Sequence, residues 1–182
     1  TGAEYIAAFL EKQNCNNIFL VTGGACAFIV DAISRNPSLK YIPMQHEQSA
    51  AMAADVTWKV KRKVGVTLAT SGPGATNLIT GIACSYFDSI PSIHITGQVN
   101  KKEKIPFQNA NVRQAGFQET KIVEMVKPIT KYAVKVNTTE ELRKELAKAY
   151  AIALQGRKGP VLIDVPMDVQ QAEVIEEILL PN

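Results

Sequence analysis

The chain has 182 residues, of which 46% are hydrophobic, and this suits one globular domain with a sizeable core. Its 20 basic and 17 acidic residues give a net charge of +3, which is too small for a nucleic-acid-binding surface unless the basic residues cluster. The one dense basic cluster, residues 59–63, closes a helical stretch, where cations stabilise the negative end of the helix dipole. We therefore predict no nucleic-acid partner.

No apolar run approaches the roughly 20 residues that a membrane span needs, and no signal-peptide pattern opens the chain. Cys15, Cys26 and Cys84 are far apart and odd in number, so they predict neither a metal site nor a disulfide framework. These observations favour a reducing environment, and we expect a cytoplasmic protein with no membrane partner.

Strand-like and helix-like runs alternate along the chain, which is the pattern of a parallel sheet with helices on both faces. Several strand candidates are nearly continuous in apolar residues, as strands buried on both faces require. The predicted strands are residues 18–21, 41–44, 64–69, 92–96, 132–136 and 161–165. The sequence thus predicts an α/β fold with an open, mainly parallel six-stranded sheet.

Between the last two strands lies the clearest predicted helix, residues 140–154, which has a Thr138-x-x-Glu141 capping box before it and Gly156 after it. The one long irregular stretch, residues 99–116, exceeds an ordinary connection, so we expect it to be functional or mobile. We predict that the domain spans residues 1–170 and that residues 171–182 begin a linker to a further domain.

Three strand-to-helix junctions carry residues suited to chemistry, and such junctions meet at the carboxyl edge of a parallel sheet, where ligands bind. They are the Gly23-Gly24 turn, Glu47, and the glycine-rich run of residues 70–77. Glycines let the backbone approach a ligand, and helix N-termini offer unpaired N–H groups. The 70–77 run lacks the lysine of a Walker loop and the spacing of a dinucleotide fingerprint. It predicts a ligand loop without naming the ligand, and a purely structural turn is the alternative.

The order of these motifs resembles the N-terminal, pyrimidine-binding domain of thiamine-diphosphate enzymes, and among them most closely the acetolactate synthases. The resemblance covers residues 2–169. The matching stretches are Gly23-Gly24-Ala25, His46-Glu47-Gln48-x-Ala50-Ala51, Ala69-Thr70-Ser71-Gly72-Pro73-Gly74-Ala75-Thr76-Asn77, Asp88-Ser89-x-Pro91, Thr96-Gly97-Gln98-Val99, Gly116-Phe117-Gln118-Glu119-Thr120 and Gly159-Pro160-Val161-x-Ile163-Asp164-x-Pro166.

The resemblance implies that Glu47 is the catalytic residue, because the matching glutamate hydrogen-bonds N1′ of the aminopyrimidine ring and favours its imino tautomer. The alternative is an acid at a helix start that is stabilised by the dipole. His46 and His94 are expected to be hydrogen-bonding or core histidines. The resemblance further implies the cofactor-binding residues Gly23, Gly24, Glu47, Ser71, Gly72, Pro73 and Asn77.

Five further roles are implied by the same resemblance. Gln98, Phe117, Gln118 and Lys131 match residues on the substrate side of the site, and Arg157 matches an arginine that contacts FAD in acetolactate synthases. Three of the five have a plainer alternative, since Phe117 could be a core aromatic residue, and Lys131 and Arg157 could be ordinary surface cations.

Three residues depart from the acetolactate synthase pattern, which usually has glycine in place of Leu20 and proline in place of Thr22 and Asn100. The 100–116 loop is also longer than in that family. We expect these changes to border the substrate channel. They leave open a related decarboxylase or carboligase with another keto acid, and a non-catalytic binding or assembly module of the same fold.

The implied activity is that of a decarboxylating carboligase that condenses a 2-keto acid such as pyruvate, as in branched-chain amino acid biosynthesis. Its cofactors would be thiamine diphosphate and Mg²⁺, with FAD as a third candidate. The chain carries no Gly-Asp-Gly followed by Asn-Asn, the magnesium and diphosphate motif of the family. We therefore expect no metal ligand here, and a diphosphate-binding domain supplied by another subunit of a homodimer or tetramer.

Overall fold

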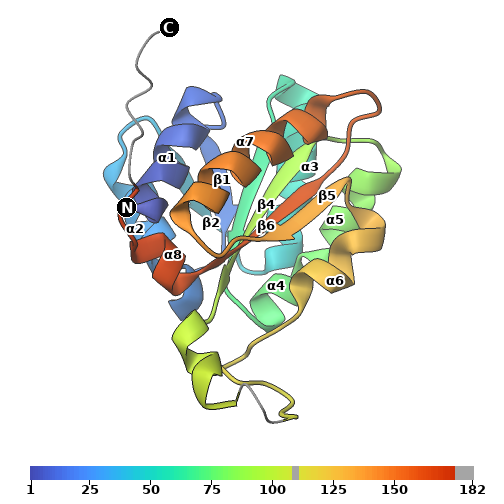
Figure 1. Ribbon diagram of the computed structural model, residues 1–182. Helices are drawn as coiled ribbons and strands as arrows, with labels where there is room; N and C mark the ends of the chain where they lie inside the picture. The colour runs from blue at the N-terminus through green and yellow to red at the C-terminus, as the bar shows by residue number, and fades with distance from the viewer. Residues whose placement is uncertain (108–110, 175–182) are drawn as a thin grey trace, which may run out of the picture.

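The computed structural model describes residues 1–107 and 111–174, and its centre is one six-stranded sheet (Figure 1). The strand order is β2-β1-β3-β4-β6-β5, and every pairing among the described residues is parallel. The strands are β1 (Asn17–Leu20), β2 (Lys40–Pro43), β3 (Gly65–Ala69), β4 (Ser92–Gln98), β5 (Tyr132–Lys135) and β6 (Val161–Pro166). The predicted α/β fold and all six predicted strands are confirmed, and the largest difference is that β4 continues to Gln98.

Helices cover both faces of this sheet (Figure 1). The first layer contains α1 (Gly2–Lys12), α2 (Ala27–Arg35), α7 (Thr139–Leu154) and α8 (Met167–Gln171). The second layer contains α3 (Glu47–Lys61), α4 (Pro73–Asn77), α5 (Ile79–Phe87) and α6 (Ile122–Val126). Three short 3-10 helices, η1 (Gly24–Cys26), η2 (Lys101–Phe107) and η3 (Lys127–Ile129), complete the described elements.

Each face of the sheet has its own apolar core, because neighbouring strand residues point to opposite faces. Under the first layer the strands contribute Ile18, Leu20, Val66, Leu68, Ile93, Ile95, Val161, Ile163 and Val165. Under the second layer they contribute Ala69 and Leu162, which pack with Ala51, Leu78, Ile82, Ile122 and Val126 from the helices. Every residue of β3, β4 and β6 is buried, as expected for strands that are covered on both faces.

Helix α3 lies close to α5, because small residues face each other across the contact. A Cβ atom added at Gly81 would come within 2.3 Å of the Ala51 Cβ. One turn further on, the buried Asp55 carboxylate accepts a hydrogen bond from Ser85 Oγ at 3.0 Å and pairs with Lys59 Nζ at 2.7 Å. These contacts fix α3 and therefore its first residue, Glu47.

Helix α7 confirms the predicted helix within one residue. Thr138 Oγ1 accepts a hydrogen bond from the Glu141 backbone N–H at 3.1 Å, and the Glu141 carboxylate accepts one from the Asn137 N–H at 2.7 Å. The second half of the capping box is therefore shifted by one residue. Gly156 follows the helix with φ +57°, the left-handed conformation that glycine adopts readily.

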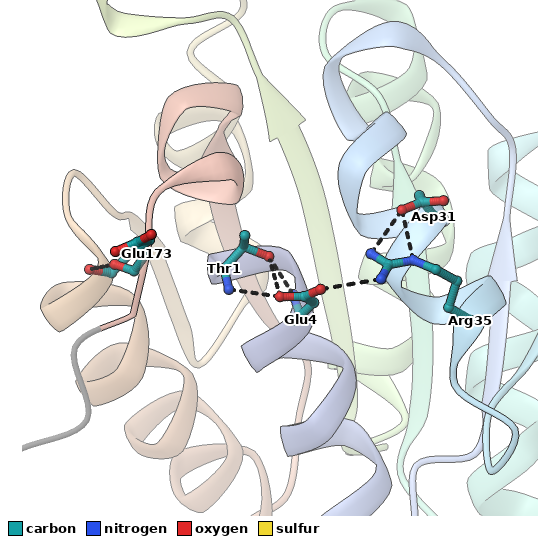
Figure 2. A network of polar contacts seen from close by, with 6 residues as sticks. Thr1, Glu4, Asp31, Arg35 and Glu173 are labelled. Carbon is teal, nitrogen blue, oxygen red and sulfur yellow. Dashed lines mark hydrogen bonds and ion pairs between the residues drawn. The ribbon is translucent and has the colours of Figure 1, made fainter. Parts of the chain in front are cut away.

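The outer surface of the first layer carries an exposed polar network that joins α1 and α2 (Figure 2). Arg35 pairs with Glu4 at 3.2 Å and with Asp31 at 2.9 Å, and Thr1 Oγ1 donates to Glu4 at 3.0 Å. The chain returns beside α1, since the Ala172 carbonyl accepts a hydrogen bond from the Gly2 backbone N–H at 2.9 Å, and the next carbonyl, of Glu173, accepts one from Thr139 Oγ1.

Two of the sequence predictions fall partly outside the described residues. The expected linker, 171–182, is described only to residue 174, and its first residue closes α8. The long stretch 99–116 is described except for 108–110, and residues 101–107 of it form η2. Over the two described ranges, we find no helix with the length and apolar character to cross a bilayer.

Candidate functional site

The site lies at the carboxyl edge of the sheet, where the strand order β2-β1-β3 places three junctions next to one another. Glu47 follows β2, the Gly23-Gly24 turn follows β1, and residues 70–74 follow β3. The predicted convergence of these junctions on one edge is confirmed.

Glu47 is the first residue of α3, and its side chain is buried, with 8% of the residue exposed. Its Oε2 atom accepts a hydrogen bond from Asn77 Nδ2 at 2.9 Å. Its Oε1 atom has no hydrogen-bond partner among the described residues, so it can accept a bond from a ligand. A carboxylate at a helix start is favoured by the dipole, but that alone does not require burial or a bond to Asn77.

Thr70 joins the turn after β1 to the turn after β3 and lies beside this carboxylate. Its Oγ1 accepts a hydrogen bond from the Ala25 backbone N–H at 3.2 Å. A Cβ atom at Gly23 would lie 2.5 Å from Thr70 Cβ, and one at Gly74 would lie 3.3 Å from Glu47 Oε1. Gly74 therefore keeps a side chain away from the carboxylate, and Gly23 lets Thr70 pack against the turn after β1. Sequence reasoning did not single out Thr70, although its place between two glycine turns was a usable signal.

Gly72 brings a distant loop to the same edge. It has φ +65°, and a Cβ atom there would lie 2.7 Å from Gln118 Cβ. Gln118 therefore lies against Gly72, which stands in the chain between the buried Ser71 and Pro73, the first residue of α4. The neighbouring Phe117 is 77% exposed, so the alternative of a core aromatic residue is wrong.

Gln98 ends β4 and is buried, with 2% of the residue exposed. Its amide nitrogen donates to Asp164 Oδ2 at 3.0 Å and to the Thr120 carbonyl at 2.9 Å, and its Oε1 accepts from the Val99 N–H. Burial raises the pKa of Asp164 to about 6, although hydrogen bonds from Thr96 and Gln98 act in the opposite direction. The substrate-side role of Gln98 stays a prediction, because its polar atoms are bonded inside the chain.

Gln170 is another residue that sequence reasoning missed. It is fully buried on α8, and its amide nitrogen donates to the Ala25 carbonyl at 2.7 Å and to the Val165 carbonyl at 2.8 Å. Thr70 binds the N–H of Ala25 and Gln170 binds its carbonyl, so the turn after β1 is held from both sides. No local signal marks such a residue, because its partner Ala25 is 145 positions away in the sequence.

The two histidines have the hydrogen-bonding roles that the sequence suggested. His46 caps α3, since its Nδ1 accepts a hydrogen bond from the Gln48 N–H at 3.1 Å. His94 is fully buried in β4 between Thr67 Oγ1 and Ser92 Oγ, at 2.8 and 2.9 Å. Burial lowers the pKa of His94 to about 3, so this side chain is neutral near pH 7.

Lys131 and Arg157 lie at the opposite edge, because they precede β5 and β6. The Lys131 ammonium group donates to the Ile152 and Gln155 carbonyls, and Arg157 Nε donates to Ser89 Oγ at 2.7 Å. A pocket of about 440 Å³ is lined by Lys131, Arg157, Lys158, Tyr86 and Phe87. Within one chain the structure does not bring Lys131 or Arg157 to Glu47, and their ligand roles stay predictions.

A buried carboxylate between glycine turns at the carboxyl edge of a parallel sheet defines an α/β ligand-binding domain. Residues 1–125 match the family described as "Thiamine pyrophosphate enzyme, N-terminal TPP binding domain", thiamine pyrophosphate being another name for thiamine diphosphate. The chain belongs to this family, and the resemblance of its motifs is confirmed.

The chain is also similar to several acetolactate synthases. It is 38% identical to the chloroplastic enzyme of Arabidopsis thaliana over 181 residues, which cover 100% of this chain and 25% of that protein. It is 39% identical to the large subunit of Corynebacterium glutamicum over 174 residues, covering 96% and 26%. It is 41% identical to the isozyme 2 large subunit of Escherichia coli over 171 residues, covering 94% and 30%. The chain thus spans between a quarter and a third of each of these relatives.

Proposed function

We propose that this chain forms the aminopyrimidine-binding half of the thiamine-diphosphate site in an enzyme like the acetolactate synthases. The enzyme would decarboxylate a 2-keto acid, with pyruvate as the first candidate, and join the product to a second keto acid, as in branched-chain amino acid biosynthesis. The observation that carries the proposal is the buried Glu47 carboxylate, with Oε2 held by Asn77 and Oε1 open to a ligand.

The residues around Glu47 fit the aminopyrimidine ring. Gly74 places no side chain against Oε1 of the carboxylate, which a Cβ atom there would approach to 3.3 Å, and Gly23 lets Thr70 pack against the turn after β1. We assign Oε1 the hydrogen bond to N1′ of the ring, while Asn77 fixes the orientation of the carboxylate. Burial excludes water and so strengthens the electrostatic effect of the charge on this bond. Bound thiamine diphosphate supplies the electron sink for decarboxylation and carbon–carbon bond formation.

Within residues 1–107 and 111–174 no three His, Cys, Asp or Glu side chains form a group that could hold a metal. We assign the Mg²⁺ and diphosphate ligands to a separate domain of a partner subunit in a homodimer or tetramer. The exposed Phe117, at the edge that carries Glu47, supports a protein contact there. A cytoplasmic location stays a prediction.

FAD is a second cofactor candidate, and its proposed contact is Arg157. The pocket beside Arg157 has two aromatic rings and three cationic side chains, which suits an anionic ligand with a flat ring system. This pocket lies at the edge of the sheet opposite Glu47, so FAD would contact a different part of the domain from the aminopyrimidine.

The choice of keto acid depends on the departures from the acetolactate synthase pattern. Leu20 is fully buried in the apolar core, so its side chain does not border a channel. Asn100 donates its backbone N–H to Glu103, and its side chain accepts a bond from the Lys102 N–H, two contacts that proline would remove. The segment after β4 thus has local contacts that a proline at position 100 would not form. For this reason we retain an enzyme with a different keto acid substrate as the alternative.

The proposal is tested by calorimetric titration of thiamine diphosphate with Mg²⁺ into the chain, alone and mixed with the remainder of its enzyme. We expect tight binding in the mixture, and strongly weakened binding for Glu47→Gln with an unchanged circular dichroism spectrum. The control is Glu11→Gln, the same chemical change on the exposed surface of α1. Turnover of pyruvate by the mixture should fall about 10²–10⁴-fold in Glu47→Gln and stay unchanged in the control.

Two outcomes would contradict the proposal. A folded mixture that binds no thiamine diphosphate would favour the non-catalytic module. Binding that is equal for the wild type and Glu47→Gln would remove the proposed role of Glu47. A mixture that binds the cofactor but does not consume pyruvate would instead favour the alternative keto acid.

A further inference from the structure

A chain of hydrogen bonds connects the interior of the sheet to the loop of residues 116–120. It begins at Asp164 on β6, which is buried with 1% of the residue exposed. Asp164 Oδ2 accepts from the Gln98 amide nitrogen at 3.0 Å, and the same nitrogen donates to the Thr120 carbonyl at 2.9 Å. An amide nitrogen has two protons, so Gln98 uses one for the sheet and one for the loop.

The loop that this chain reaches lies beside the candidate site. Gln118 has φ +55° and lies against Gly72, as the 2.7 Å approach of a Cβ atom at Gly72 indicates. Two residues later, the Thr120 carbonyl accepts the hydrogen bond that joins the loop to Gln98. The position of Gln118 and Phe117 at the edge that carries Glu47 therefore depends on where Gln98 holds Thr120.

Asp164 is the residue that orients the amide group of Gln98. Its other oxygen accepts from Thr96 Oγ1 at 2.7 Å, so β4 surrounds the carboxylate with neutral donors only. The charged groups that act on it are Lys135 from β5, which favours the anion, and Glu124 from α6, which disfavours it. Helix α7 covers the opposite face of the sheet, and Asp168 on α8 pairs with Lys101.

We propose that Asp164 is a positioning residue for the site at Glu47. By holding the amide of Gln98 it ties the 116–120 loop to the sheet, so that Gln118 and Phe117 face the ligand from the side of Gly72. The hydrogen bonds from Asp164 to Gln98 and from Gln98 to Thr120 form a tether for the loop, and this tether exists whatever the proposed function. Its effect on a thiamine-diphosphate site rests on the proposed function.

Three variants separate the tether from a general effect on stability. Asp164→Asn keeps an acceptor for Gln98, because its amide nitrogen can donate to the Thr96 hydroxyl while its oxygen faces Gln98. Asp164→Leu keeps the number and branching of the side-chain heavy atoms but leaves the Gln98 N–H without an acceptor. Thr96→Val removes the other hydrogen bond to the same carboxylate and leaves the Gln98 bond in place, so it is the matched control.

The first measurement is hydrogen–deuterium exchange of the whole chain, followed in the segment 115–121. We expect Asp164→Leu to speed exchange there by about tenfold or more while β1 and β2 keep their wild-type rates. Asp164→Asn and Thr96→Val should stay within about threefold of the wild type in this segment. Unchanged rates in Asp164→Leu, or an equal acceleration in β1 and β2, would overturn the proposal.

The second measurement connects the tether to the ligand. In the assembled enzyme, Asp164→Leu should raise KM for pyruvate by about tenfold with a smaller change in kcat, and Asp164→Asn should restore the wild-type value. Equal KM values for the wild type and Asp164→Leu would overturn the proposal even if exchange is faster. A wild-type enzyme that binds no thiamine diphosphate would overturn the proposed function and this role together, while the exchange result would still report on the tether.

Discussion

The two faces of the sheet differ in what the strands present to the helices. In the described part of the chain, the fully buried strand side chains that face α1, α2 and α7 are apolar, such as Leu68, Ile95 and Ile163. Toward the second layer the same strands also present Thr67, His94, Thr96 and Asp164, all buried. Each of these four side chains is hydrogen-bonded to another polar side chain.

This difference shows how one sheet can serve both cohesion and chemistry. Buried apolar side chains add stability without directional requirements, whereas buried polar groups must find partners with defined geometry. The first face, which has the larger apolar core, therefore contributes most of the cohesion between the layers. The second face leads through Asp164 and Gln98 to the loop beside Glu47, so its polar groups fix positions at the candidate site.

The largest expected effect is a loss of folding stability at acidic pH, caused by the buried His94. The pKa of His94 is about 3 in the folded protein, and burial is the cause. Between its ordinary value, about 6.5, and 3 the unfolded chain binds a proton that the folded one does not, so stability is full above pH 6.5 and is lost as the pH falls. Over this whole window the loss amounts to about 5 kcal/mol.

Urea unfolding at pH 7.5 and pH 4.5 measures this effect in the wild type and in His94→Gln, which stays polar but does not titrate. We expect the stability of the wild type to fall by about 3 kcal/mol more than that of the variant between these two values. Equal losses in the two proteins would show that His94 does not govern the acid response of the polar face.

The apolar face is tested by Ile163→Ala, which removes a fully buried side chain from β6. The cavity and the lost apolar burial should reduce the free energy of unfolding by about 2–5 kcal/mol. Val60→Ala, at a position that is 73% exposed on α3, is the control and should change it by less than about 0.5 kcal/mol. Similar effects at both positions would contradict the assignment of cohesion to the first face.

Asp164→Asn is expected to change the free energy of unfolding by a smaller amount and in the opposite direction, toward greater stability. The pKa of Asp164 is raised from 3.8 to about 6 by burial, so the folded protein favours the protonated form. The stability associated with this group is present below pH 3.8 and is lost as the pH rises through 6. At pH 7.5 the variant should therefore be more stable than the wild type by up to about 3 kcal/mol.

The same comparison at pH 3.5 supplies the control, because the carboxyl group is then largely protonated in both folded and unfolded chains. We expect the difference between Asp164→Asn and the wild type to disappear there. A variant that is less stable at pH 7.5 would mean that the charged hydrogen bonds outweigh the cost of burying the carboxylate.

The sequence was most informative where the structural signal is local. Strand bounds followed from short apolar runs, and Thr138 and Gly156 marked the ends of α7. Glu47 was found because a carboxylate at a strand-to-helix junction stands out beside two glycine turns. The resemblance to the family grouped Lys131 with Gln98, but the structure places them at opposite edges of the sheet. A match between sequence motifs does not specify where their residues lie in the fold.

The sequence by itself determined the alternation of strands and helices, the parallel sheet and the family, because periodicity and motif order are properties of neighbouring residues. Only the tertiary structure decided that Thr70 meets Ala25 and that Asp164 meets Gln98, pairs that are 45 and 66 positions apart. Those partners depend on the strand order β2-β1-β3-β4-β6, which sets the neighbours of each buried polar group. A buried hydrogen-bonding group must be paired, but the strand beside it decides with which residue.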